Sequence, residues 1–266
     1  MKNIRKIIFL TVFLACISNF AFAKGFVRQN NFMDKSGVER RDELKRWQAL
    51  MNLPVTGTLD EKTKTALYTE NYEAYDEIKN PPSKGYWIAI NKSRRTLTLY
   101  KGSKSQGKYP VTLGTNATPT PSAKAKMQNK HKNPAWGGMG GKYTPVAADD
   151  PNNPLGERWM GLRIPGQNGY GIHGNIKPHQ IGGYYSNGCI RMFNYDIENY
   201  VFPIVPVGAP VWLGTDNELE SWGLYQYSRI MKEKPAPKPV EKPVEKSVED
   251  PMMQIEKVNA GELLEF

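Results

Sequence analysis

Cysteine is nearly absent from this sequence of 266 residues, which contains only Cys16 and Cys189. The first lies in an N-terminal segment, 1–23, where basic residues precede an apolar run and the small-x-small site Ala21-Phe22-Ala23. This is the pattern of a cleaved secretory signal peptide. Cleavage would leave Cys189 as a lone thiol in a compartment where cysteines are usually paired or absent. Such a thiol is either a buried apolar residue or a reactive group.

The apolar run, 7–17, is shorter than the roughly 20 residues that cross a bilayer as a helix. We therefore expect cleavage near Ala23 and export to the periplasm or cell wall. An uncleaved anchor and lipid attachment at Cys16 are the alternatives, although Phe13 and Leu14 suit a lipoprotein site poorly.

Metal-binding patterns are also lacking, since the sequence has three histidines and neither Cys-x-x-Cys nor His-Glu-x-x-His. A zinc site built from His173, His179 and Cys189 would lack a fourth ligand at a familiar spacing. We expect no metal and no cofactor, and we interpret His131 and His179 as incidental surface or loop residues.

Acidic residues are scarce in one long segment, 85–214, which has 15 basic and 5 acidic side chains and carries most of the net charge of +10. This excess suits a polyanionic partner such as acidic wall polymer, peptide carboxylates or a membrane surface. Nucleic acid fits the charge equally well, but an exported chain seldom meets it, so we expect no nucleic-acid partner. We also expect no obligate protein partner.

Helical periodicity covers residues 40–53, and Pro54 and Gly57 then break the chain before a second predicted helix, Glu61 to Tyr68, capped by Thr58 or Asp60. The pattern WQALMNLPVTGTLDEKTKTAL resembles the peptidoglycan-binding-like helical domain, and we assign it to a small all-α domain, 24–80. A helical spacer that binds nothing is the alternative.

From Tyr86 the periodicity changes to two, which predicts a β-hairpin and a mainly β domain over 85–214. Further strands are expected at 109–113, 163–164, 171–172 and 209–213, and a helix at 194–205 with Asn194 as its N-cap. An extension, 215–232, precedes a Pro/Lys/Glu-rich tail, 233–266, which has too few apolar residues to fold and is expected to be disordered.

The stretch GIHGNIKPHQIGGYYSNGCIRM, residues 171–192, carries the chemistry. Gly188 lets the backbone approach closely, so a turn could aim the N–H groups of Gly188 and Cys189 at an oxyanion. A free thiol is mostly protonated at neutral pH. The imidazole of His173 would convert it to a thiolate or an ion pair, and would return the proton to a departing amine.

One ring nitrogen of His173 must face the sulfur, so the other needs an acceptor that fixes the tautomer. No acidic residue lies between Glu157 and Asp196. We therefore expect a backbone carbonyl near Gly174 or Ser186 to be that acceptor.

Substrate contacts are expected from side chains beside the cysteine. Arg191 could hold a substrate carboxylate through its planar fork, and Asn187 could offer hydrogen bonds. Four aromatic residues would either line the cleft or pack in the core, namely Trp136, Trp159, Tyr184 and Tyr185.

At these residues the sequence resembles the L,D-transpeptidase family with its YkuD-type catalytic domain. The likeness rests on IHGN followed by SNGCIRM, and extends upstream through NPLGERWMGLRI, TPTP and YWIAINKSRRTLTLY. The resemblance implies a β-sandwich of mixed sheets over 85–214, with Cys189 as nucleophile and His173 as proton donor and acceptor. It also implies that Ser186, Gly188 and Arg191 shape the site.

Two departures from the family pattern bear on the site. Asn187 stands where many members carry a second histidine, so no proton transfer is assigned to that position. Ser122 replaces a common glycine, and the basic stretch KAKMQNKHK follows it. These changes leave the substrate preference and the lid over the cleft open.

The implied reaction is ping-pong acyl transfer within cell-wall peptides. Cys189 would attack the carbonyl of the third residue of a peptidoglycan stem peptide, release D-alanine, and pass the acyl group to an amine of another stem. With water as acceptor the enzyme would be an L,D-carboxypeptidase. A wall-binding protein without catalysis and a zinc peptidase are the rival classes.

Overall fold

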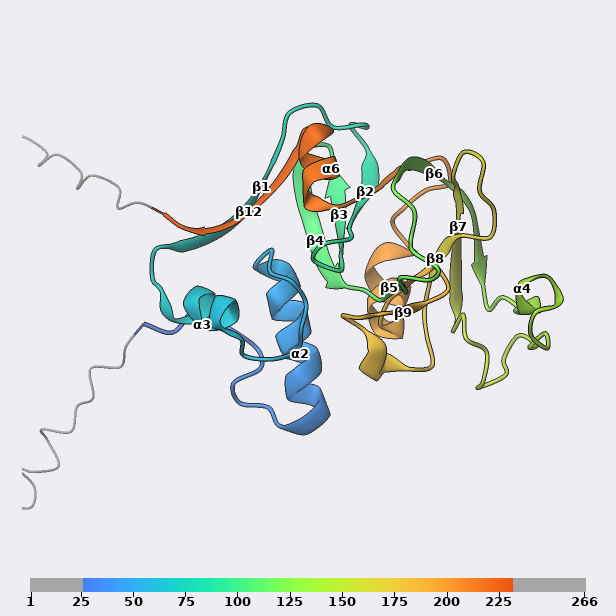
Figure 1. The fold of residues 1–266 in the computed structure, drawn as a ribbon, viewed down its shortest axis with the longest axis horizontal. Helices are drawn as coiled ribbons and strands as arrows, with labels where there is room; N and C mark the ends of the chain where they lie inside the picture. Colours follow the sequence, from blue (N-terminus) through green and yellow to red (C-terminus); the bar gives the residue numbers. More distant parts are fainter. Residues whose placement is uncertain (1–25, 232–266) are drawn as a thin grey trace, which may run out of the picture. The chain divides into compact units, whose positions relative to one another are not determined.

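The computed structural model describes residues 26–231, whose largest element is an eight-stranded mixed sheet (Figure 1). The strands are β2 (Tyr86–Asn91), β3 (Thr96–Lys101), β4 (Lys104–Pro110), β6 (Ala123–Lys132), β7 (Arg158–Arg163), β8 (Gly171–His173), β10 (Ile190–Arg191) and β11 (Pro210–Gly214). Their order is β10-β8-β7-β6-β11-β2-β3-β4. β8 pairs with β10 and β2 with β11 in parallel, whereas the other neighbours are antiparallel. The predicted mainly β fold with mixed strands is confirmed.

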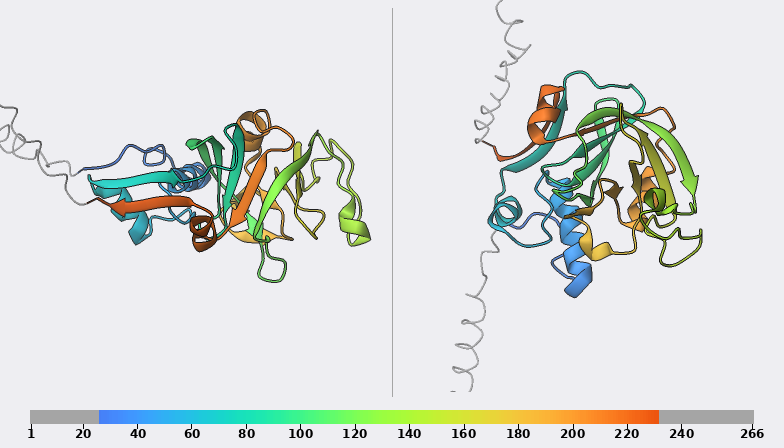
Figure 2. Two further views of the ribbon diagram at one scale, coloured as in Figure 1. Left: turned by 90° about the horizontal axis from the view of Figure 1, so that it is seen from above. Right: turned by 45° about the vertical axis from the view of Figure 1, so that its right-hand side comes forward.

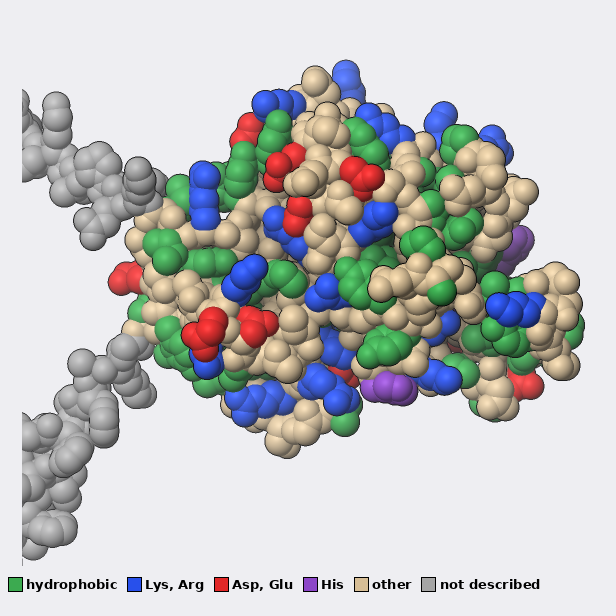
Figure 3. Space-filling model, viewed as in Figure 1, with side chains coloured by type: hydrophobic (Ala, Val, Ile, Leu, Met, Phe, Trp, Pro, Cys, Tyr) green, Lys and Arg blue, Asp and Glu red, His purple; other side chains and the backbone are tan. Residues whose placement is uncertain are grey.

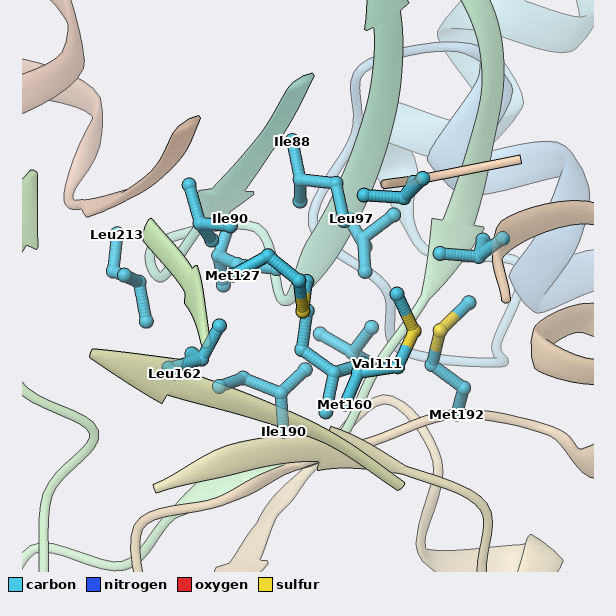
Figure 4. Packing of buried hydrophobic residues seen from close by; sticks show 14 of the residues in the cluster. Ile88, Ile90, Leu97, Val111, Met127, Met160, Leu162, Ile190, Met192 and Leu213 are labelled. Carbon is cyan, nitrogen blue, oxygen red and sulfur yellow. The ribbon is translucent and has the colours of Figure 1, made fainter. Parts of the chain in front are cut away.

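The sheet curls so that strands from distant positions in its order share one apolar core (Figures 2 and 4). Ile88 and Leu97 come from β2 and β3, whereas Met160 and Ile190 come from β7 and β10, yet all four are buried in one cluster. The predicted sandwich is therefore formed largely by one continuous sheet folded over its own core. A second small sheet pairs β5 (Leu113–Gly114) with β9 (Tyr184–Ser186) beside it.

The predicted hairpin is present as β2 and β3, and both of its faces are buried. One face joins the main core, and the other packs against a second apolar cluster that includes Trp87, Tyr100 and Trp212. The rings of Trp87 and Tyr100 stack with centroids 4.5 Å apart. Burial on both sides makes this hairpin a rigid centre for the sheet.

The two predicted helices are α2 (Gly37–Leu50) and α3 (Glu61–Tyr68). The second has the predicted bounds, and Asp60 caps it by accepting a hydrogen bond from the N–H of Thr63 at 2.9 Å. The first begins and ends three residues earlier than expected. It ends there because Asn52, with a positive φ of 55°, turns the chain into the following loop.

The loop between these helices is organised by the buried amide of Gln48. Its oxygen accepts from the N–H groups of Thr56 and Gly57, and its nitrogen donates to the hydroxyl of Thr63 and the carbonyl of Thr58. A glutamine inside an otherwise apolar helix face therefore fixes the loop rather than binding a ligand.

The strands β6, β9 and β10 were not predicted, and the segment 24–80 is not all-α as expected, because it contains a strand. Two further unpredicted strands, β1 (Tyr72–Ile78) and β12 (Leu224–Ile230), pair antiparallel over their full length. Each has polar residues on both faces, and its hydrogen-bonding partner lies about 150 residues away in the chain. A short helix, α6 (Asp216–Ser221), precedes β12 and begins with a capping box between Thr215 and Glu218.

Two further expectations, for residues 194–205 and 109–113, were wrong. The helix predicted at 194–205 is a short turn, α5 (Asn194–Asp196), followed by the π-helical segment η2 (Ile197–Val201). Asn194 does not cap it, because its side-chain oxygen accepts from the N–H of Asn175 at 2.7 Å. The strand predicted at 109–113 is divided between the end of β4 and the start of β5.

The predicted signal segment, 1–23, and the predicted tail, 233–266, lie outside the described residues, as does Cys16. Within residues 26–231 no helix is long and apolar enough to cross a membrane.

A buried ion pair links β1 to β4. Lys108 lies 2.6 Å from a carboxylate oxygen of Asp76, whose other oxygen accepts from the hydroxyl of Tyr100. The two charged side chains are only 8% and 4% exposed. Burial lowers the pKa of Lys108, and the Asp76 carboxylate opposes that shift.

We predict that Asp76→Ala destabilises the protein by about 3–5 kcal/mol, because it leaves the ammonium of Lys108 buried without its counterion. Urea unfolding followed by circular dichroism measures the change. The double variant Asp76→Ala with Lys108→Met should recover part of the loss. A single variant within about 0.5 kcal/mol of wild type would show that the ion pair does not hold β1 against β4.

Candidate active site

The site is built by the parallel pairing of β8 with β10. In this pairing Ile190 lies opposite Ile172, and Arg191 lies opposite His173. Cys189 comes one residue before β10, so it shares a strand face with Arg191, two positions along. The side chains of Cys189, Arg191 and His173 therefore project from the same face of two neighbouring strands.

The strand register extends this set of neighbouring side chains into a row that crosses the sheet. Trp159 of β7 lies opposite His173, and His131 of β6 lies opposite Trp159. Arg191, His173, Trp159 and His131 thus follow one another on four adjacent strands, and all four line the same cavity.

The ring of His173 is buried and held on two sides. Its Nδ1 lies 2.7 Å from the carbonyl oxygen of Gly174, and its plane stacks against Trp159 at a centroid distance of 5.9 Å. Trp159 is fixed in turn by donating Nε1–H to the side-chain oxygen of Asn129 at 3.1 Å. Because a carbonyl oxygen only accepts, Nδ1 carries the proton and Nε2 keeps a lone pair. The backbone acceptor predicted for the ring is therefore the carbonyl of Gly174.

The glycines on either side of the histidine are required by close packing. A Cβ on Gly171 would lie 2.5 Å from the ring of Trp159, and one on Gly174 would lie 2.3 Å from the side-chain oxygen of Asn194. The motif Gly-x-His-Gly thus leaves room for the two side chains that hold the histidine strand.

The turn before the cysteine is closed by the hydroxyl of Ser186. It donates to the carbonyl of Cys189 at 2.6 Å and accepts from the N–H of Gly188 at 3.1 Å. Gly188 has a φ of 113°, which only glycine adopts readily, and its carbonyl accepts from the hydroxyl of Thr120. The Gly188 amide is therefore already engaged, contrary to the expectation that it faces an oxyanion.

The thiol of Cys189 is partly exposed and lines the cavity, with Sγ 3.5 Å from the carbonyl oxygen of Gly169. Desolvation raises the pKa of Cys189, while the amide of Gly171 and the charge of Arg191 act in the opposite direction. Burial, with a smaller effect of Arg191, lowers the pKa of His173 to about 4. Both shifts favour the neutral thiol and neutral imidazole at neutral pH, in contrast to the expected thiolate or ion pair.

Arg191 makes one side-chain hydrogen bond within residues 26–231. Its Nη1 donates to the side-chain oxygen of Gln180 at 3.1 Å, whereas its buried Nε has no hydrogen-bond partner among the described residues. A guanidinium edge formed by Nε and Nη2 matches the two oxygens of a carboxylate.

The cavity has a volume of about 930 Å³ and brings together five of the predicted residues: Cys189, His173, Arg191, Asn187 and Ser186. The other three predicted residues do not line it. Gly174 and Gly188 act through their backbones, as described above. Tyr185 is 58% exposed, and its ring lies against Gly183.

Several lining residues were missed from the sequence. His131 is exposed, as expected of a surface residue, but β6 places it on the cavity lining beside Trp159, with Lys132 and Asn133 next to it. The signal was present, since Ala125 and Met127 alternate with lysines as in a half-buried strand. His179 behaves as expected: it is exposed, and it does not line the cavity.

A loop after β6 forms one wall of the cavity. It contains α4 (Gly138–Gly141), and both Trp136 and Met139 line the site. The amide of Asn187 lies 3.6 Å from the sulfur of Met139, which joins this wall to the cysteine turn. Of the four aromatic candidates, Trp136 and Trp159 line the cavity, whereas Tyr184 and Tyr185 do not.

The charged side chains on the cavity lining are basic. They are Lys132 and Arg191, and the described lining includes no acidic side chain. Figure 3 shows that lysines and arginines are otherwise scattered over the face in view rather than gathered in one patch. Among residues 26–231 no group of three His, Cys, Asp or Glu side chains could hold a metal ion.

Comparison with known proteins shows which protein family the segment with this site resembles. The YkuD family, the L,D-transpeptidase catalytic domain, matches residues 85–213. The putative L,D-transpeptidase YqjB of Bacillus subtilis is 30% identical over 161 residues, which cover 60% of this chain and 88% of that protein. This chain belongs to the L,D-transpeptidase family.

Two further L,D-transpeptidases extend the comparison. The putative L,D-transpeptidase YkuD of Bacillus licheniformis is 35% identical over 134 residues, which cover 50% of this chain and 68% of that protein. The solved L,D-transpeptidase of Xylanimonas cellulosilytica aligns with a TM-score of 0.45 and 15% identity, covering 67% of this chain and 81% of that one.

The L,D-transpeptidase match spans β2 to β11, so it includes the whole eight-stranded sheet and the row of residues on it. The family resemblance predicted for this segment is confirmed. The helices α2 and α3 and the strands β1 and β12 lie outside the match.

We predict that Gly171→Ala lowers kcat/KM at least tenfold for the L,D-transpeptidase reaction proposed below. The added methyl displaces Trp159 and with it the ring of His173. Gly85→Ala is the matched control, since its nearest neighbour would be the Ser83 hydroxyl at 3.4 Å and its φ is not positive. Steady-state kinetics on both folded variants measures the difference. Equal activity of the two would contradict the proposed support of His173 by Trp159.

We also predict a thiol that titrates as a neutral acid. The rate of Cys189 alkylation by iodoacetamide should rise steadily with pH from about pH 5 to about pH 9, following the thiolate fraction. The reason is that burial disfavours both the thiolate and the imidazolium. A plateau of high reactivity at neutral pH would instead indicate a preformed thiolate–imidazolium pair. Intact mass spectrometry follows the reaction.

Proposed function

We propose that this protein is a peptidoglycan L,D-transpeptidase in which Cys189 is the nucleophile and His173 transfers the proton. The observation that carries the proposal is the β8–β10 register, which sets both side chains on one strand face and opens them to one cavity. The fixed tautomer of His173, with Nδ1–H directed to Gly174, leaves Nε2 free to accept the thiol proton.

The reaction begins from the neutral pair. Cys189 Sγ forms a bond to the carbonyl carbon of the third stem residue while its proton moves to Nε2 of His173. The tetrahedral intermediate then collapses, the C–N bond to D-alanine breaks, and the same proton passes from Nε2 to the departing amine. A thioester remains on Cys189.

Deacylation repeats these steps with a second stem peptide. Its amine gives a proton to Nε2 and attacks the thioester carbon, and the sulfur leaves and recovers the proton. The new amide bond is a cell-wall cross-link. A depressed His173 pKa suits this cycle, because the ring stays neutral until it receives each proton.

The negative charge on the carbonyl oxygen needs a donor in the transition state. The N–H of Gly188 is engaged by Ser186, so we assign the oxyanion to the N–H of Cys189. The Ser186 hydroxyl then acts by closing the turn that aims this amide. No cofactor is needed for the sequence of steps.

Arg191 is assigned to a substrate carboxylate, because the partner-free Nε lies on the edge left open by Gln180. Asn187 and Lys132 lie on the cavity lining and would contact the rest of an anionic peptide. The absence of acidic side chains in the described lining favours a substrate rich in carboxylates. Stem peptides of peptidoglycan have this chemistry.

The same cavity could admit water as the acyl acceptor, which would give L,D-carboxypeptidase activity. Because stem peptides lie outside the cytoplasm, we also propose that the chain is exported to the periplasm or cell wall. The basic catalytic segment would then meet acidic wall polymer.

Intact mass spectrometry tests the assignment of the nucleophile. Incubation with a wall tetrapeptide or a carbapenem should add one acyl group to the wild-type protein and none to Cys189→Ala, which lacks the sulfur that forms the thioester. Cys189→Ser is a conservative control that keeps a hydroxyl at the same place. An adduct that persists on Cys189→Ala would refute this assignment.

Product analysis separates the two activities. Cross-linked dimer in the presence of an amine acceptor supports transpeptidation, whereas tripeptide alone supports the carboxypeptidase.

A further inference from the structure

The guanidinium of Arg191 is positioned by one loop, residues 178–183, which we call the clamp loop. The side chain of Gln180 on this loop is the hydrogen-bond acceptor for Arg191. On the active-site side the loop is bonded to the segment before β5. The hydroxyl of Thr112 donates to the carbonyl of Gln180 at 2.7 Å, and the N–H of Gly182 donates to the carbonyl of Val111 at 3.1 Å.

The opposite side of the clamp loop is covered by the α2–α3 segment, residues 37–68. Val55 is fully buried there, and a Cβ on Gly182 would lie 2.8 Å from its side chain. The N–H of Val55 donates to the carbonyl of Arg94 at 2.9 Å. The guanidinium of Arg95 donates to the carbonyls of both Val55 and Gly182, at 2.8 and 2.7 Å.

A buried lysine makes the second contact. Lys45 of α2 is 3% exposed, and its Nζ lies 3.4 Å from the carbonyl oxygen of His179. Its acidic neighbour Asp42 is 3.7 Å away, a long ion pair. A buried ammonium with so few partners is a weak source of stability, and this one lies directly against the clamp loop.

We propose that the α2–α3 segment is a working part of the active site, in which Lys45 and Val55 are positioning residues that hold the clamp loop and thereby fix Arg191. They touch the loop on both sides of Gln180, at His179 and Gly182. If the loop moves at either contact, the side-chain oxygen of Gln180 moves with it and no longer orients the guanidinium of Arg191. The part played by Arg191 in binding a carboxylate rests on the proposed function, whereas its placement beside Cys189 does not.

The first test is alkylation of Cys189 by iodoacetamide as a function of pH, which needs no peptide substrate. The charge of Arg191 lowers the pKa of Cys189, so a displaced guanidinium should slow alkylation. We expect Lys45→Met to react roughly threefold more slowly than wild type at pH 8, a shift of about half a pH unit. Lys45→Met should remain folded, because it replaces a poorly paired buried charge with an apolar side chain of similar length.

Four companion variants test whether Lys45 and Val55 act on Arg191 through Gln180. Val55→Ala, which changes no charge, should shift the curve in the same direction, and Lys45→Arg, which keeps a donor, should restore most of the rate. Lys64→Met is the matched control, because that lysine is exposed on α3 and pairs only with Glu61. In a Gln180→Leu background, Lys45→Met should add no further shift.

The second test uses donor tetrapeptide and its fully amidated analogue. Lys45→Met should raise KM for the free carboxylate donor roughly threefold to tenfold while kcat stays within about twofold, and KM for the amidated donor should not change.

An unchanged alkylation curve in folded Lys45→Met and Val55→Ala overturns the proposed coupling. A full effect of Lys45→Met in the Gln180→Leu background also overturns it. If wild type turns over neither donor while the alkylation shifts appear, the proposed function has failed and the coupling stands.

Discussion

The parallel hydrogen bonding of β8 to β10 is the constraint on which the site depends. Each strand is very short, yet its register decides that Arg191 lies beside His173 and that Cys189 shares their face. A shift of one residue would turn the cysteine to the opposite face of the sheet. The register is held by packing at both ends, through the close approach of Trp159 to Gly171 and of Asn194 to Gly174.

The chemistry follows from how little water these side chains meet. Burial depresses the pKa of His173 and raises that of Cys189, and both shifts favour an uncharged resting pair at neutral pH. In the proposed mechanism, charge is created only as the thiol attacks, when Nε2 of His173 takes the proton and the N–H of Cys189 stabilises the oxyanion. Carbonyl groups, rather than a carboxylate, surround the histidine, which keeps the ring from being held as imidazolium before substrate binds.

Local sequence patterns predicted those elements of the fold whose determinants are local. The helix α3 follows from the cap at Asp60. The hairpin at β2 and β3 follows from the aliphatic residues at every second position, namely Ile88, Ile90, Leu97 and Leu99. The pairing of β1 with β12 could not be predicted in this way, because neither strand has a continuous apolar face and each needs a partner far along the chain. The predicted helix at Asn194 failed for a related reason: a distant residue, Asn175, takes the side chain that would have capped it.

The sequence by itself determined the candidate reacting groups: Cys189 after a glycine, His173 followed by a glycine, and no carboxylate nearby in the chain to serve the ring. Only the tertiary structure decided their protonation and their surroundings. It engaged the Gly188 amide with Ser186, brought His131 and Trp159 into the row, and set Lys45 and Val55 against the clamp loop. The physical reason is that residue type fixes which bonds a side chain can make, whereas burial and strand register fix which bonds it does make.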